Sequence, residues 1–271
     1  MSVEKISILG CGWTGMALAE SLVAKGQIVK GSTTRISKLG EIALAGVIPF
    51  VVKANPTLEG DRLDSFFDCD VLIVTLPPPR KEGHAKWPYA VHQSIVNHAV
   101  AHEIKHVVLF SSSSVYPNTK GVVTEADAIN QTSPHSGVDL KAIEDSYAAK
   151  LGEKLLVCRF AGLFGPGRHP GRFLRNQSAI RCGANPVNLT HLSDVVGAVS
   201  YLINQQAAGA FNICSPAHPT RQSFYSKAIS SLGLPVPSFS NEACDYKEVS
   251  TEKLVELGYS YVVENPEDVL N

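Results

Sequence analysis

Three closely spaced glycines near the start of the chain constrain its fold more than any other feature. Gly10, Gly12 and Gly15 form a G-x-G-x-x-G pattern directly after an apolar run, residues 5–9, that predicts a buried strand. The next stretch, residues 16–25, has the apolar periodicity of a helix. A strand, this turn and a helix in that order indicate a dinucleotide-binding loop.

Each glycine has a separate task in such a loop. The first permits a tight turn, the second lets the backbone approach a pyrophosphate, and the third lets the helix pack closely. The start of the helix also offers amide donors and a partial positive charge to phosphates. The predicted loop contacts are Gly10, Cys11, Gly12, Trp13, Thr14 and Gly15. The alternative is a glycine-rich turn without a ligand. Cys11 is either a thiol whose pKa the helix lowers or a small residue that fits under the cofactor.

Predicted strands alternate with predicted helices along most of the chain. The predicted strands are residues 5–9, 27–33, 47–52, 70–75, 106–111, 154–159 and 210–214, and the predicted helices are residues 16–25, 36–45, 89–103, 139–150, 193–204, 223–232 and 251–257. This alternation predicts an α/β fold of the Rossmann type, a doubly wound parallel sheet with a small C-terminal lobe. We expect a dinucleotide-binding domain at residues 1–165. Residues 166–271 should form a small substrate or lid lobe with elements returning to the sheet.

The end of the second predicted strand indicates which dinucleotide binds. NAD-binding folds usually carry Asp or Glu there to hold the ribose 2′-hydroxyl. This chain has Ser32, Thr33, Thr34 and Arg35 instead, and Arg35 suits a 2′-phosphate. We therefore predict NADP, with NAD the less favoured cofactor, and assign Thr34, Arg35 and Leu76 to its site. The alternative is that Arg35 is a solvated surface residue.

Charge and hydropathy exclude several classes of partner. The formal net charge is −1, so no strong field attracts nucleic acid or an anionic membrane. We found neither an apolar run long enough to span a membrane nor a secretory signal, so we expect a cytoplasmic protein without membrane or nucleic-acid partners. The six cysteines form no Cys-x-x-Cys pair, and we expect all of them to be reduced thiols.

Four further segments accompany the glycine loop: Phe110-Ser111-Ser112-Ser113-Ser114-Val115-Tyr116, Arg159–Gly167, His191–Val196 and Leu257-Gly258-Tyr259. Together they resemble the extended short-chain dehydrogenase/reductase superfamily, also called the NAD-dependent epimerase/dehydratase family. The resemblance covers nearly the whole chain. It implies a Rossmann fold, a bound nicotinamide dinucleotide, and a Ser or Thr at the position of Ser112 that contacts the reacting oxygen, with Ser113 and Ser114 beside it.

The resemblance fails at the family's acid/base pair. A Tyr-x-x-x-Lys pair on the next helix normally supplies the proton. Aligned on Glu144, its tyrosine position falls on Ser136 and its lysine position on Leu140. The match from Tyr116 to Lys120 lies in a proline-containing loop, so we interpret it as coincidence. The chain therefore resembles an atypical subgroup that keeps the cofactor loop but lacks this pair.

Other polar clusters have two interpretations each. Arg168, His169, Arg172 and Arg175 either bind an anionic substrate or form a solvated basic loop, and His169 is also a candidate acid/base. His98, His102 and His106 are expected to be surface residues rather than metal ligands. His191 and Asp194 are expected to be structural.

Two functions remain open from the sequence. The first is an NADP-dependent reductase, epimerase or dehydratase with an unusual active site, acting on an unidentified small molecule. Its candidate catalytic residues are Ser112, Ser113 and Tyr116, with His169 or a water as further proton donors. The second is a non-catalytic dinucleotide-binding sensor or regulatory protein, which the missing acid/base pair favours. The oligomeric state is not assigned.

Overall fold

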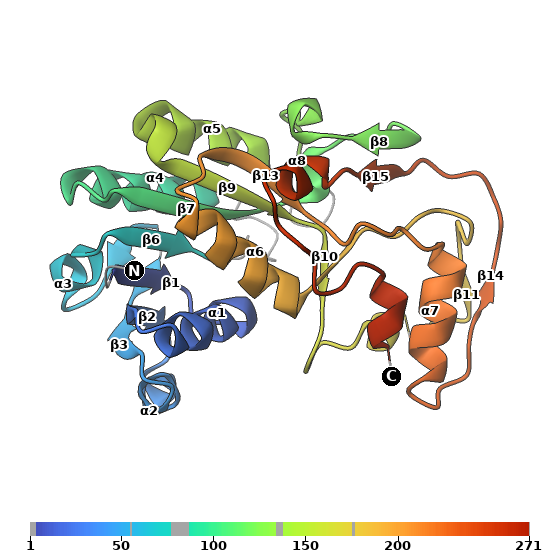
Figure 1. Cartoon of the computed structure of the whole chain (residues 1–271), viewed down its shortest axis with the longest axis horizontal. Helices are drawn as coiled ribbons and strands as arrows, with labels where there is room; N and C mark the ends of the chain where they lie inside the picture. The colour runs from blue at the N-terminus through green and yellow to red at the C-terminus, as the bar shows by residue number, and fades with distance from the viewer. Residues whose placement is uncertain (1–3, 55, 77–86, 134–137, 175–176, 271) are drawn as a thin grey trace. The chain divides into compact units, whose positions relative to one another are not determined.

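The computed structural model describes residues 4–54, 56–76, 87–133, 138–174 and 177–270. A seven-stranded parallel sheet has the order β13-β9-β7-β6-β1-β2-β3 (Figure 1). Its strands are β1 Lys5–Leu9, β2 Ile28–Thr33, β3 Ile48–Val51, β6 Val71–Val74, β7 His106–Ser112, β9 Leu155–Phe160 and β13 Gly209–Ile213. The chain moves outward from β1 in one direction and from β6 in the other. This doubly wound order confirms the predicted fold class.

The helices follow the predicted order with shifted ends. They are α1 Trp13–Ala24, α2 Leu39–Leu44, α3 Leu63–Phe67, α4 Trp87–Ala101, α5 Leu140–Leu151, α6 Leu192–Asn204, α7 Arg221–Ser230 and α8 Glu252–Glu256. The stretch predicted as one helix at residues 36–45 is a 3-10 turn, η1 Ile36–Lys38, followed by α2. The short helix α3 was not predicted. No helix in the described ranges has the length and apolar character needed to cross a membrane.

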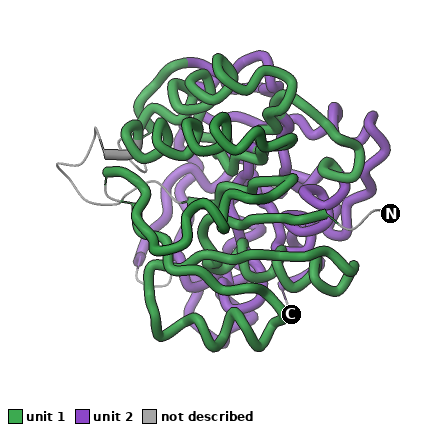
Figure 2. The backbone as a smooth tube through the Cα atoms, turned by 90° about the vertical axis from the view of Figure 1, so that its left-hand side faces the viewer, with its two compact units in different colours: residues 1–115, 130–158, 202–210 green, residues 116–129, 159–201, 211–271 purple. Residues whose placement is uncertain are grey.

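The chain forms two compact units, each made of three segments (Figure 2). Unit 1 comprises residues 1–115, 130–158 and 202–210, and unit 2 comprises residues 116–129, 159–201 and 211–271. The sequence predicts a single boundary at residue 165. The observed division is interleaved instead, because β9 and β13 each begin in unit 1 and end in unit 2.

The core of unit 1 covers the central strands on both faces. Leu72 and Val74 of β6 belong to one buried cluster with Ile95 of α4. Side chains alternate along a strand, so the buried Ile73 points to the opposite face. A strand buried on both faces is expected to be a continuous apolar run, as β6 is. Each such fully buried side chain contributes about 1.5–3 kcal/mol to stability.

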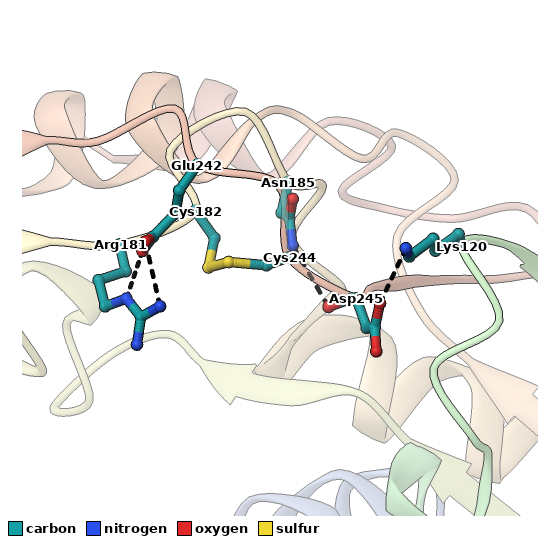
Figure 3. Close-up of a disulfide and its surroundings, with 7 residues drawn as sticks. All are labelled: Lys120, Arg181, Cys182, Asn185, Glu242, Cys244 and Asp245. Atoms are coloured by element: carbon teal, nitrogen blue, oxygen red, sulfur yellow. Dashed lines mark hydrogen bonds and ion pairs between the residues drawn. A yellow bond between two sulfur atoms is a disulfide. The ribbon is translucent and has the colours of Figure 1, made fainter.

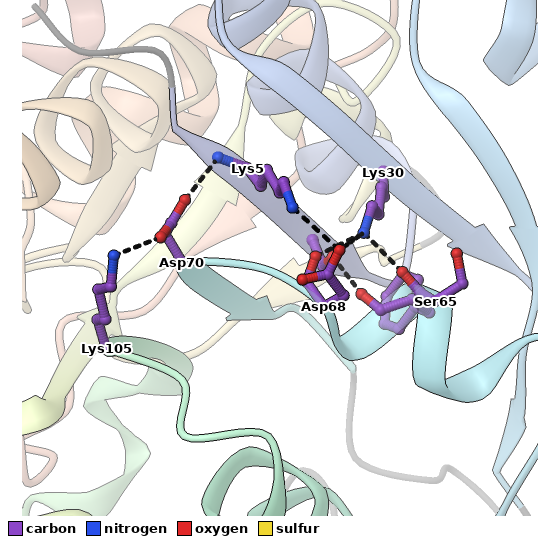
Figure 4. A network of polar contacts seen from close by, with 8 residues as sticks. Lys5, Lys30, Ser65, Asp68, Asp70 and Lys105 are labelled. Atoms are coloured by element: carbon purple, nitrogen blue, oxygen red, sulfur yellow. Dashed lines mark hydrogen bonds and ion pairs between the residues drawn. The ribbon is translucent and has the colours of Figure 1, made fainter.

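A polar network joins the amino-terminal ends of the strands in unit 1 (Figure 4). Lys5 Nζ lies 3.0 Å from Asp68 Oδ2, and the buried Lys30 Nζ donates to the carbonyls of Ser65 and Asp68, at 2.6 Å each. Asp70 accepts from Lys5 N at 3.0 Å and from Lys105 Nζ at 2.7 Å. Lys30 thus satisfies carbonyls at the end of α3, where the helix leaves acceptors unpaired.

Unit 2 is built from short parallel strand pairs. These are β8 Gly121–Val123 with β15 Lys247–Val249, β10 Gly162–Phe164 with β12 Leu189–His191, and β11 Ala179–Ile180 with β14 Ser238–Phe239. Asp194 is fully buried and accepts from Tyr259 Oη at 2.9 Å and from the amides of Val262 and Val263, at 2.7 and 3.0 Å. The structural role expected for Asp194 agrees with these contacts.

The expectation that all six cysteines are reduced is wrong for two of them. Cys182 and Cys244 of unit 2 form a disulfide, although 62 residues separate them in the sequence. No local pattern marks this pair in the sequence, because the two residues are brought together by contacts between distant segments, among them the pairing of β11 with β14. Cys11, Cys69, Cys158 and Cys214 are free thiols.

A buried histidine links two helices of unit 1. His92 Nδ1 of α4 lies 2.9 Å from Tyr147 Oη of α5. Burial lowers the pKa of His92 from 6.5 to about 4, and burial raises the pKa of Tyr147 above its usual range. His92 is therefore neutral in the folded protein well below the pH at which it takes up a proton in the unfolded chain.

This shift predicts a loss of stability in mild acid. As the pH falls from 6.5 to about 4, His92 becomes protonated in the unfolded chain but stays neutral in the folded protein. The free energy of unfolding should therefore fall by on the order of 3 kcal/mol across that window because of this group. His92→Gln removes the titration, so urea melts at a series of pH values should show a flatter profile. Equal profiles for wild type and His92→Gln would contradict the assignment.

Candidate functional site

The first glycine of the loop is held in a turn that requires glycine. Gly10 has φ +112°, a backbone region that other residues rarely adopt. Its amide donates to Ser32 Oγ at 3.0 Å, and its carbonyl accepts from Thr75 Oγ1 at 2.5 Å. Cys11 N donates to the carbonyl of Ser32 at 2.7 Å. The loop is therefore fixed to the ends of the two strands that flank β1.

The other two glycines differ in what surrounds them. A Cβ on Gly15 would lie 2.2 Å from the carbonyl oxygen of Gly10, so only glycine lets α1 start this close to the turn. A Cβ on Gly12 would meet nothing within 4 Å. Gly12 is the N-cap of α1, and the first helical bond runs from Met16 N to the Gly12 carbonyl. The amides of Thr14 and Gly15 therefore have no partner within the helix, beside an open space.

This loop lies where the strand order of the sheet reverses. β1 pairs with β2 on one side and with β6 on the other, all in parallel, so their carboxyl ends share one edge. The order of an open α/β sheet changes direction at this point, and ligands bind in the crevice outside such strand ends. β7 pairs with β6 in parallel, which brings the serine-rich end of β7 to the same edge.

The remaining loop residues are half-buried or exposed. Trp13 and Thr14 are half-buried, and Leu76 packs against the core cluster that contains Leu72. Burial raises the pKa of Cys11 to about 11, although a hydrogen bond with the Ser32 backbone opposes the shift. The thiol of Cys11 is therefore protonated at neutral pH, and the interpretation of a helix-activated thiol is wrong.

The end of β2 presents a free cation and no acid. Thr34 and Arg35 are exposed, and the Arg35 amide donates to Thr33 Oγ1 at 3.2 Å. Among the described residues, the Arg35 guanidinium makes neither a hydrogen bond nor an ion pair. The nearby Lys38 is engaged with Glu41, at 2.9 Å. Arg35 therefore keeps its charge available to an anion.

The serines at the end of β7 have distinct partners in unit 1. Ser112 Oγ accepts from the Ser114 amide at 3.2 Å, which leaves the Ser112 hydroxyl hydrogen to be donated elsewhere. Ser111 Oγ donates to Glu144 Oε1 at 2.5 Å, and Glu144 of α5 is only 3% exposed. Ser113 is half-buried and begins the 3-10 turn η2 Ser113–Val115. The Ser111–Glu144 pair was not predicted, because no local sequence pattern links two residues that are 33 positions apart.

Leu140, which stands at the lysine position of the missing acid/base pair, has apolar surroundings in the structure. Leu140 is the first residue of α5 and packs against the main core cluster of unit 1. Asp139 caps the helix by accepting from Ala142 N at 3.0 Å. Ser136, which the alignment places at the tyrosine position, lies outside the described residues, as do Pro77–Pro79 and Arg175.

Tyr116 lies in the interior of unit 2. It is 1% exposed, and its hydroxyl donates to Asn212 Oδ1 at 2.5 Å and accepts from Arg159 Nη1 at 2.9 Å. The same Arg159 nitrogen donates to the carbonyl of Glu125 at 2.9 Å. The Tyr116 phenol is thus engaged by two buried partners, Asn212 and Arg159, and it has a structural role in unit 2.

The predicted substrate-binding residues also lie in unit 2. Arg172 is exposed, and the guanidinium of Arg168 lies 5.8 Å from the ring centre of Phe173. His169 caps the 3-10 turn η5 Pro170–Arg172, since its Nδ1 accepts from Gly171 N at 3.2 Å. Partial burial and the charge of Arg172 lower the pKa of His169. His169 is therefore a neutral cap at pH 7 in this structure.

The remaining histidines of interest have aromatic or backbone partners. His98 and His102 stack on Phe67, with ring centres 4.6 and 5.7 Å from it. His106 Nε2 lies 3.0 Å from the carbonyl of Ala207. The expectation of surface positions is wrong for His106, which is buried, and His98 and His102 are half-buried, because all three pack against these partners.

Comparison with known proteins places the chain among relatives along its full length. It is 37% identical to Protein YeeZ of Escherichia coli K12 over 270 residues, which is 97% of this chain and 98% of YeeZ. A search against protein-family models found no match.

Solved structures show the same fold at low sequence identity. WbmG of Bordetella bronchiseptica, in complex with NAD, has a TM-score of 0.78 at 17% identity over 99% of this chain and 92% of WbmG. MoeE5, in complex with UDP-glucose and NAD, has a TM-score of 0.77 at 19% identity over 98% and 96% of the two chains. A functionally unknown protein from Silicibacter pomeroyi has a TM-score of 0.76 at 21% identity over 99% and 97%.

The glycine loop, the doubly wound sheet and the full-length match to YeeZ agree with one another. The resemblance inferred from the motifs is confirmed at the level of the fold by the solved structures. The chain belongs to the family of Protein YeeZ and has the fold of the extended short-chain dehydrogenase/reductase enzymes, the NAD-dependent epimerase/dehydratase group.

Proposed function

We propose that the protein binds NADP(H) across the Gly10–Gly15 loop. The observation that carries this proposal is the open space in front of Gly12, beside the amides at the start of α1 and at the point where the strand order reverses. A pyrophosphate fits such a place because helix amides and the helix dipole attract anions. The solved neighbours WbmG and MoeE5, described in complex with NAD, support a nicotinamide dinucleotide.

The preference for NADP(H) over NAD(H) rests on the end of β2. The hydroxyls of Thr33 and Thr34 suit a 2′-phosphate, as does the guanidinium of Arg35, which has no partner among the residues that the structure describes. A guanidinium binds phosphate through two parallel charge-assisted hydrogen bonds. A carboxylate at this strand end, which would hold a 2′-hydroxyl and repel a 2′-phosphate, is missing from the sequence.

We also propose that the protein is an atypical enzyme of its superfamily, with Ser112 as the group that contacts the reacting oxygen. The Ser112 hydroxyl can donate a hydrogen bond to a carbonyl that receives hydride from the dinucleotide. Leu140 cannot supply the cation that normally assists the proton donor. Because general acid–base catalysis contributes about 10²- to 10⁴-fold, we expect slow turnover.

A second function is favoured by the packing of Leu140 into the core. A protein that only senses the dinucleotide needs no proton donor at the start of α5, and Leu140 serves the core there. Such a protein would bind NADP(H) and show no turnover. The experiments below separate the two functions, because they measure binding and turnover independently.

Gly12→Val tests the binding site directly. A valine side chain meets no protein atom near its Cβ, so the fold and the melting temperature should be kept. Its branches would occupy the pyrophosphate position, so NADPH affinity should fall about 100-fold or more by calorimetry. Gly15→Ala is the matched contrast, because its Cβ would lie 2.2 Å from a backbone oxygen and should lower stability itself. Unchanged NADPH affinity in folded Gly12→Val would refute the site.

Arg35→Ala tests the cofactor preference. Loss of its charge-assisted hydrogen bonds should weaken NADPH binding by about 10- to 150-fold at fixed salt and leave NADH binding unchanged. Lys38→Ala is the control, because the Lys38 ammonium is already paired with Glu41. Equal weakening of both cofactors by Arg35→Ala would show that Arg35 does not contact the 2′-phosphate.

Ser112→Ala tests the catalytic proposal. The wild-type protein is tested with NADPH and a panel of carbonyl substrates, and turnover is measured as the change in NADPH absorbance. We expect slow turnover. Removing one hydrogen-bond donor to the developing oxyanion should lower that turnover about 100-fold without changing NADPH affinity. Ser136→Ala should have a much smaller effect. Turnover that survives Ser112→Ala but is lost in Ser136→Ala would contradict the alignment, and no turnover in wild type would favour the sensor.

A further inference from the structure

The disulfide of unit 2 fastens one segment of the chain to another across a long sequence distance. Cys182 lies two residues after β11, and Cys244 lies between β14 and β15, with the two Cα atoms 5.7 Å apart (Figure 3). We call residues 238–249, from the start of β14 to the end of β15, the strap. The disulfide is the covalent link between this strap and the end of β11.

Noncovalent contacts surround the disulfide on both sides. Arg181 and Glu242 form a two-pronged ion pair beside it, and Lys120 Nζ lies 3.2 Å from Asp245 Oδ1 (Figure 3). Asn185 Nδ2 donates to the Asp245 carbonyl at 3.4 Å. These contacts do not depend on the sulfur–sulfur bond. They would therefore keep the two thiols near each other after reduction, so that the bond can form again.

The four free cysteines are poorly suited to thiol chemistry. Burial raises the pKa of Cys11 to about 11 and that of Cys214 to about 12, and it raises the pKa of Cys69 and Cys158 as well. Only the thiolate attacks a disulfide, so these groups are unreactive at neutral pH. Cys182 and Cys244 are both partly exposed, so a small thiol can reach their bond.

The backbone at Cys182 is also strained. Its φ of +62° lies in the left-handed region, which is unfavourable for a residue with a side chain. Such a conformation persists only where its surroundings hold it. Here the Gly183 amide donates to the Ser240 carbonyl of the strap at 2.8 Å, and the disulfide joins the same two segments. Opening the disulfide removes one of these restraints and lets the strain relax.

We propose that Cys182–Cys244 is a reversible thiol–disulfide exchange site that controls how firmly the strap is held to β11. Its co-reactant is a low-molecular-weight thiol of the glutathione class. A first thiolate attacks one cysteine sulfur, the Cys182–Cys244 bond breaks, and a mixed disulfide forms while the other cysteine leaves as thiolate. A second thiolate then attacks the mixed disulfide. The small thiol is oxidised to its disulfide, and the protein takes two electrons and two protons. Partly exposed disulfides are the ones that such thiols reduce most readily.

The exchange site contains no residue of the Gly10–Gly15 loop, and its test does not use dinucleotide binding as a readout. It also gives the two cysteines a role that the proposed function does not use. In the oxidised state the strap is fixed covalently. In the reduced state noncovalent contacts alone hold it: hydrogen bonds, ion pairs and the apolar packing of Phe239 and Val249.

The chemical test is a redox titration of the native full-length protein. The protein is equilibrated with a series of reduced-to-oxidised glutathione ratios, alkylated under denaturing conditions and digested. We expect peptides containing Cys182 and Cys244 to change together from linked to alkylated within this series, and back again, while the other four cysteines remain alkylated throughout. A bond that never forms in oxidised glutathione, or that never opens in reduced glutathione, would overturn the proposal.

The structural test is hydrogen exchange of the oxidised and reduced proteins. Reduction should raise the amide hydrogen-exchange rates of residues 238–249 by about tenfold or more. The reason is that no covalent bond then opposes local opening of the strap. Cys182→Ser should exchange like the reduced protein in both buffers, and Cys69→Ser should respond to reduction like wild type. Equal hydrogen-exchange rates of the strap in the oxidised and reduced wild-type protein would also overturn the proposal. This result would not depend on whether the protein binds NADPH.

Discussion

The contact between Gly15 and the carbonyl of Gly10 is the constraint on which the rest of unit 1 depends. It allows α1 to begin immediately after β1 and to lie close to the sheet. Because α1 begins so early, its amino-terminal amides lie at the carboxyl edge of β1 and β6, where the strand order reverses. One side chain at position 15 would separate the helix from the turn and remove both the close packing and the anion-binding geometry.

The two ends of the sheet strands in unit 1 carry different kinds of chemistry. At the amino-terminal ends, Lys5, Lys30 and Lys105 are engaged by nearby carboxylates and carbonyls, so their charges are compensated. At the carboxyl ends, the Arg35 guanidinium has no hydrogen-bond or ion-pair partner among the described residues, and the space before Gly12 is open. This difference between the two edges supports the dinucleotide site proposed at the carboxyl ends of the strands.

Long patterned segments were predictable from the sequence, and contacts between distant residues were not. The apolar run of β6 and the glycine loop each carry a local signal, and both were located correctly. Ser111 and Glu144 lie 33 residues apart, and nothing local marks them as partners. Tyr116 was a candidate proton donor by its place after the serines, but Asn212, 96 residues away, engages its hydroxyl in the core of unit 2. Strands of two residues, such as β11 and β14, are too short to show an alternating pattern.

The most direct test of the account is a crystal structure of the protein grown with NADP⁺. The account predicts the pyrophosphate at the amides of Thr14 and Gly15, in the space before Gly12, with the 2′-phosphate against the Arg35 guanidinium. It also predicts that the nicotinamide lies toward the β7 end, near the Ser112 hydroxyl. A dinucleotide bound elsewhere on the protein, or its absence at saturating concentration, would contradict the account.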